Sequence, residues 1–77
     1  MRTGIVISYN PPVRFGLIKD CNGQKIRFFN DDQNWVFRRF DVVRFSVAYL
    51  DAGLRAVNVT AVIDAQGNSV SLAIRIN

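Results

Sequence analysis

The amino-acid sequence predicts a small all-β domain, and its composition, turn signals and length each contribute to this prediction. Residues that favour strands are abundant: the chain has 10 valines, 7 isoleucines and 9 aromatic residues, whereas glutamate, a strong helix former, is absent. Short apolar runs are separated by turn-forming groups such as Asn10-Pro11-Pro12 and Asn22-Gly23. A chain of 77 residues makes one domain, so residues 1–77 are expected to form a single unit.

The first half of the chain is predicted to form three strands joined as a meander. The first strand is expected at residues 3–9, before the Pro-Pro turn, and the second at residues 13–19. The third is expected at residues 24–30, because Asn-Gly between two strand-like runs is the strongest short hairpin signal.

The second half is predicted to form three further strands, at residues 42–50, 55–64 and 69–76, with turns at residues 51–53 and 66–68. Between the halves, residues 31–34 break the strand pattern, and residues 35–40 are too few and too rich in aromatic and β-branched residues for a helix, so a loop with one helical turn is expected. This order of elements, namely a three-strand meander, a long connection and a closing hairpin, is that of a five-stranded OB-fold barrel. The predicted fold is this barrel with an added C-terminal strand.

Alternation along the strands predicts which side chains form the core and which face solvent. The expected core consists of apolar residues on the inward faces: Val6, Ile18, Ile26, Phe28, Val43, Phe45, Val47, Val57 and Val59. On the outward faces, Tyr9, Phe15 and Phe29 are expected to form an exposed aromatic surface on which unpaired bases can stack. Trp35 and Phe37 are expected to close one end of the barrel, although a loop aromatic at Trp35 can also serve binding.

The charge of the chain indicates an anionic partner. Ten basic residues face six acidic ones, which gives a net charge of +4 and a pI near 10.0, and eight of the basic residues are arginine. Arginine is the residue of choice where phosphates or stacked rings are met, and basic domains attract nucleic acid. A charge of this size also keeps a small domain soluble, so charge alone leaves both interpretations open.

Several functional classes are excluded by what the sequence contains. There is no histidine and no glutamate, and Cys21 has no histidine to activate it, so catalysis is not expected. No Cys/His metal set or phosphate-binding glycine loop is present, so we expect no metal and no cofactor. A lone cysteine, no signal-peptide layout and no apolar run of membrane-spanning length predict a cytoplasmic protein without a membrane partner.

The chain resembles the bacterial cold-shock domain over residues 3–62. The residues that carry the resemblance occur in family order: Thr3-Gly4-Ile5-Val6 and Asn10 match its opening, Phe15-Gly16-Leu17-Ile18 most of its first RNP-like motif, Lys25 to Phe29 its second, and Arg55 to Val62 its fifth strand. The resemblance implies an OB-fold barrel that stacks bases of single-stranded RNA or DNA on its sheet face. There are departures: Ser8 stands at the position of the family tryptophan, and Arg27 replaces an aromatic residue of the second motif.

The resemblance, together with the retained aromatic and basic residues, predicts a weak binder of single-stranded RNA or DNA. The candidate binding residues are Tyr9, Arg14, Phe15, Leu17, Lys19, Arg27, Phe29, Trp35 and Arg38. Arg27 can stack through its guanidinium group. The alternative is a module for protein interaction or dimerisation that keeps the barrel and has lost most nucleic-acid binding, since Ile7 and Leu17 make the same face more apolar.

Residues 63–77 extend beyond the resemblance and are expected to add a strand. Their apolar residues Val70, Leu72, Ile74 and Ile76 need a place to bury. The extension can pair with the fifth strand across the turn at residues 66–68, or it can join the sheet edge of another protomer and make a homodimer. The sequence does not choose between these two placements.

Overall fold

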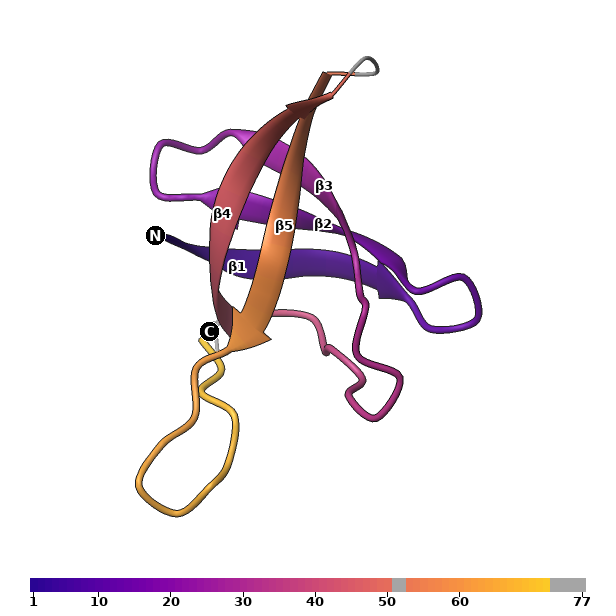
Figure 1. Ribbon diagram of the computed structural model, residues 1–77. Coiled ribbons are helices and arrows are strands. Elements are labelled where there is room, and N and C mark those ends of the chain that lie inside the picture. Colours follow the sequence, from indigo (N-terminus) through magenta and orange to yellow (C-terminus); the bar gives the residue numbers. More distant parts are fainter. Residues whose placement is uncertain (51–52, 73–77) are drawn as a thin grey trace, which may run out of the picture.

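The computed structural model describes residues 1–50 and 53–72, and over these residues the fold is all-β (Figure 1). Five strands form, with the bounds β1 Arg2–Asn10, β2 Phe15–Asp20, β3 Lys25–Phe29, β4 Val42–Leu50 and β5 Gly53–Ala61. They close into a barrel in the order β1-β2-β3-β5-β4. The predicted five-stranded barrel is therefore confirmed, and its topology is compatible with an OB fold.

The barrel is mixed, because one of its five strand pairings is parallel. β1–β2, β2–β3, β4–β5 and β1–β4 are antiparallel, whereas β3 and β5 run parallel, with Arg27 opposite Arg55 and Phe28 opposite Ala56. Figure 1 shows the long β4–β5 hairpin crossing β1 and β2 steeply, so that the sheet wraps onto itself. This crossing brings β5 beside β3, although the two strands are far apart in the sequence.

The core lies inside the barrel and agrees with most of the expected inward residues. Six of them are fully buried, namely Val6, Ile18, Ile26, Phe28, Val43 and Phe45, while Val47 and Val59 are partly buried and pack against this cluster. The placement of Val57 in the core is wrong. The β4–β5 register shifts between Arg44 and Ser46, and Asn58 has a φ of 54°, which is the pattern of a bulge. The bulge reverses the alternation, so Ala56 is buried in place of Val57.

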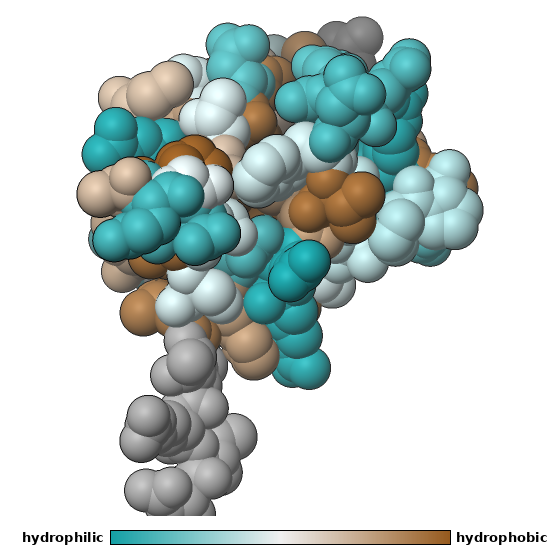
Figure 2. Space-filling view, turned by 90° about the horizontal axis from the view of Figure 1, so that it is seen from below, coloured by the Kyte–Doolittle hydropathy of each residue, from teal (hydrophilic) through white to brown (hydrophobic). Residues whose placement is uncertain are grey.

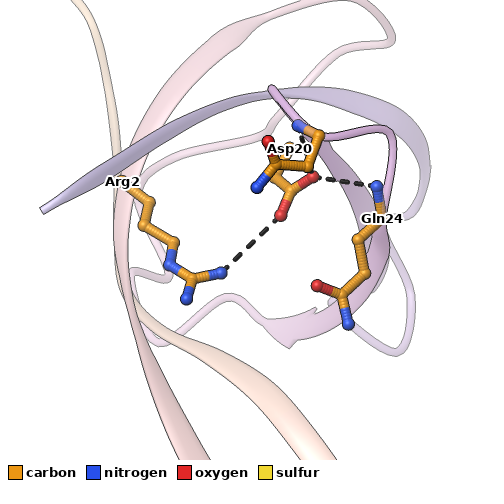
Figure 3. A network of polar contacts seen from close by, with 4 residues as sticks. Arg2, Asp20 and Gln24 are labelled. Carbon is orange, nitrogen blue, oxygen red and sulfur yellow. Dashed lines mark hydrogen bonds and ion pairs between the residues drawn. The ribbon is translucent and has the colours of Figure 1, made fainter.

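An aspartate organises the turn between β2 and β3 (Figure 3). The Asp20 Oδ1 atom accepts hydrogen bonds from the backbone N–H groups of Asn22 (2.9 Å) and Gln24 (2.8 Å). Its Oδ2 atom lies 3.6 Å from Arg2 Nη1, and Gly23 completes the turn with a φ of 81°. The hairpin predicted from Asn-Gly is thus confirmed, and the buried carboxylate is satisfied mainly by the backbone of its own turn.

The segment between β3 and β4 contains no helical turn, contrary to the expectation for residues 31–41. The Asp32 Oδ1 atom accepts a hydrogen bond from the Asn34 N–H (2.9 Å), which makes a local turn instead. Phe37 is buried in the core and Trp35 is partly buried against it. The expected packing of these two rings onto the barrel core is thus seen, with their centroids 6.4 Å apart.

The chain after β5 turns back on itself without forming a regular strand in the part that the structure describes. Residues 62–72 make isolated bridges, between Ile63 and Ser69 and between Asp41 and Ser71. Backbone bonds also run from the Val42 N–H to the Val70 oxygen (2.9 Å) and from the Leu72 N–H to the Phe40 oxygen (2.9 Å). Residues 73–76 of the expected added strand lie outside the described residues.

Over the same ranges, residues 1–50 and 53–72, no helix has the length and hydropathy needed to cross a membrane.

Candidate nucleic-acid interface

The outer face of β2 and β3 carries a pair of aromatic rings. Phe15 and Phe29 are directly opposite each other across the two strands, and their ring centroids lie 5.1 Å apart at an interplanar angle of 57°. Phe15 is 43% exposed and Phe29 is partly buried. The outward orientation expected for these two rings is confirmed, and it follows from the alternation of each strand about its inward neighbours Ile18 and Phe28.

Two arginines lie over these rings. The guanidinium carbon of Arg14 is 5.1 Å from the centroid of Phe29, and that of Arg55 is 5.8 Å from the centroid of Phe15. Arg14 takes a φ of 59° at the end of the Pro-Pro turn, and its carbonyl accepts a hydrogen bond from the Asn30 N–H (2.8 Å). Cation–π contacts of this kind hold both guanidinium groups close to the rings.

Cations face one another along the rest of this surface. Lys19 is opposite Lys25 across β2 and β3, and Arg27 is opposite Arg55 across β3 and β5. Like charges directly opposite each other destabilise a sheet. Among the described residues, the one ion pair joins Arg2 to Asp20. None of the four facing cations therefore has a carboxylate partner in the part of the chain that the structure describes. An anionic ligand would relieve the repulsion between them.

An open pocket adjoins the aromatic pair. It has a volume of about 310 Å³ and is lined by Ser8, Phe15, Gly16, Leu17 and Arg27. We call the outer surface formed by Phe15, Phe29, Leu17, the four facing cations and Arg14 the aromatic–arginine face. The pocket opens on this face, where residues of β1 and β2 meet Arg27 of β3.

Tyr9 does not belong to the aromatic–arginine face, so its expected position beside Phe15 and Phe29 is wrong. The β1–β2 register shifts between Val6 and Ser8, which marks a bulge at the intervening residue and reverses the alternation after it. The Tyr9 ring packs on the core at 5.9 Å from Phe28, and its hydroxyl accepts a hydrogen bond from Asn30 Nδ2 (3.0 Å). The same bulge turns Ser8 outward.

Trp35 and Arg38 also lie away from this face. They line a separate hollow of about 570 Å³ at the end of the barrel, together with residues of the segment after β5 such as Asn68. Figure 2 views the molecule from this end and shows separate hydrophobic patches between hydrophilic side chains. The structure thus brings together Arg14, Phe15, Leu17, Lys19, Arg27 and Phe29 of the predicted binding residues, and it leaves Tyr9, Trp35 and Arg38 elsewhere.

Sequence reasoning missed three residues of the site. Lys25 could have been found, because it alternates with Arg27 and Phe29 on the outward face of one strand. Ser8 depends on the bulge in β1, and Arg55 depends on the parallel pairing of β3 with β5. Neither of these two features has a local sequence signal.

The fold and the site together define a small five-stranded mixed β-barrel with an exposed cluster of aromatic and arginine side chains. Within the described residues, no group of three or more Cys, Asp or other metal-ligating side chains gathers in one place. Comparison of the chain with models of known protein families and with curated protein sequences gives no match.

Proposed function

We propose that the protein is a divergent, cold-shock-like OB-fold barrel that binds single-stranded RNA or DNA weakly on its aromatic–arginine face. One observation carries the proposal: two outward rings, Phe15 and Phe29, lie among cations that face one another without a carboxylate partner in the described residues. Single-stranded nucleic acid supplies what such a surface lacks, namely flat bases for the rings and phosphates for the cations.

The surface favours weak binding. Base stacking on an aromatic side chain contributes roughly 1–3 kcal/mol per base, so a two-ring surface supplies about 2–6 kcal/mol before any phosphate contact. Both rings already carry a guanidinium group, which a stacked base has to displace or share. With the electrostatic contribution of the cations, we expect dissociation constants of roughly 10 μM to 1 mM at low salt.

The test is titration of a short, labelled, pyrimidine-rich oligonucleotide with the protein, followed by fluorescence anisotropy at about 50 and about 200 mM salt. Wild-type protein should bind at low salt and lose affinity as salt rises. Phe15→Ala should weaken binding by roughly 5-fold or more, the lower end of the loss of one stacking contact. Tyr49→Ala removes an aromatic side chain that is 83% exposed and lies outside the face, so it is the matched control and should bind like wild type.

In this role the protein acts by binding alone, without a catalytic step or a cofactor. We also propose that it works in the cytoplasm, where the exposed Cys21 stays reduced. Failure to bind any oligonucleotide at low salt, combined with a dimer in sedimentation velocity, would instead favour a protein-interaction module. The homodimer through the C-terminal segment stays a prediction that the same sedimentation measurement tests.

A further inference from the structure

The three arginines of the aromatic–arginine face are not equivalent. Arg14 and Arg55 lie over Phe29 and Phe15, and these contacts hold their guanidinium groups against the rings. The Arg27 side chain is exposed and makes no hydrogen bond, ion pair or cation–π contact within the described residues. Its guanidinium group is therefore the one of the three that remains available to a ligand.

Arg27 also lines the pocket beside Phe15. The volume of about 310 Å³ lies at the small end of ligand pockets, where a single flat group such as one nucleobase fits. Phe15 offers a ring on one side of the pocket, and Leu17, directly opposite Arg27, offers an aliphatic surface. A base in this pocket would therefore have a stacking partner and a guanidinium group at its edge.

The polar groups of the pocket select among the bases. Arginine has five N–H donors in a planar fork and no acceptor, and it pairs with two neighbouring acceptors on one base edge. Guanine presents such an edge with its O6 and N7 atoms, whereas adenine is typically read by Asn or Gln and cytosine by Asp or Glu. None of these four residue types lines this pocket, and the Ser8 hydroxyl suits any base.

We propose that this pocket is a subsite for one unpaired guanine, which stacks on Phe15 and accepts two hydrogen bonds from Arg27 through O6 and N7. This inference rests on the proposed function, because guanine reaches the pocket as part of a bound single strand. It adds a base preference that the surface as a whole does not imply, since stacking and phosphate contacts tolerate any sequence.

The experiment compares three labelled oligonucleotides at low salt: oligothymidylate, the same strand with one central guanine, and the same strand with 7-deazaguanine at that position. The guanine strand should bind wild-type protein about 5-fold or more tightly than oligothymidylate, the lower end of discrimination by a bidentate arginine–guanine pair. 7-Deazaguanine lacks the N7 acceptor and should lose most of this gain. A single guanine cannot form four-stranded structures by itself, so the comparison reports on the unpaired base.

Arg27→Lys keeps the charge and removes the planar fork, so the ratio of the affinities for the guanine strand and for oligothymidylate should fall from about 5 or more to about 1, whatever the change in affinity for oligothymidylate itself. Arg44→Lys is the matched control, because Arg44 lies on the outer face of β4 opposite Thr3 and Thr60 and is not part of the pocket. Equal binding of the guanine and thymine strands by wild-type protein, or a guanine preference that survives Arg27→Lys, would overturn the inference while leaving the proposed function in place. Absence of binding to all three strands would overturn both.

Discussion

Asn30 is a buried polar residue that links the barrel to the loop between β3 and β4. It directly follows β3 and is 3% exposed, and its side chain makes three hydrogen bonds. Nδ2 donates to the Tyr9 hydroxyl (3.0 Å) and to the Trp35 carbonyl (2.6 Å), while Oδ1 accepts from the Asp32 N–H (3.0 Å). These bonds join β1, β3 and the loop that carries Trp35.

Removing this side chain should destabilise the fold substantially. A hydrogen bond contributes about 0.5–1.5 kcal/mol net, and leaving its partners buried without replacement costs more, so Asn30→Ala should lower the free energy of unfolding by about 2–4 kcal/mol. Asn30→Asp has nearly the same shape and keeps the acceptor for Asp32. It loses the bond to the Trp35 carbonyl and places a carboxylate against that oxygen, while the Tyr9 hydroxyl can turn to donate to the carboxylate, so we expect a loss of about 2 kcal/mol.

Urea unfolding followed by the fluorescence of Trp35, the single tryptophan of the chain, measures both losses. With a slope of about 1–2 kcal/mol per molar urea for a protein this small, the midpoint should fall by roughly 1–3 M. Asn34→Ala is the control in the same loop, because its side chain is exposed, and its stability should stay within about 0.5 kcal/mol of wild type. An Asn30→Asp midpoint equal to that of wild type would refute this reasoning.

Three further predictions concern the close approach of β1 to β2, the bulge in β5 and the charge of the site. Gly16→Ala should lower the free energy of unfolding in urea by about 1–3 kcal/mol, since the new Cβ would lie 2.6 Å from both Phe28 Cε1 and the backbone carbonyl oxygen of Ser8; unchanged stability would show that these neighbours move freely. At Asn58, where φ is 54°, valine should cost about 1–2 kcal/mol and glycine less than about 0.5, and the reverse order in the same assay would contradict the bulge. Lys25→Gln removes one of two facing cations, so it should reduce the slope of log affinity against log salt by about 0.7 and leave the urea midpoint equal to that of wild type or slightly higher; an unaltered slope would place the phosphates elsewhere.

Much of the fold was predictable because its signals are local. Strand-forming residues and turn signals such as Asn22-Gly23 indicate the five strands and their order, and alternation within β2 and β3 correctly assigns Ile18 and Phe28 to the core. The same alternation places Phe15 and Phe29 outside. The helical turn expected between β3 and β4 did not form, because Asp32 makes a local turn there and Phe37 is drawn into the core.

The sequence by itself therefore determined the five barrel strands, the turn between β2 and β3 and the central pair of outward rings. The tertiary structure decided which side chains surround those rings: a bulge sends Tyr9 into the core and Ser8 to the surface, and the parallel pairing of β3 with β5 brings Arg55 over Phe15. The physical reason is that one extra residue in a strand inverts every later side chain, and whether a strand accommodates it depends on the neighbouring strand rather than on its own residues.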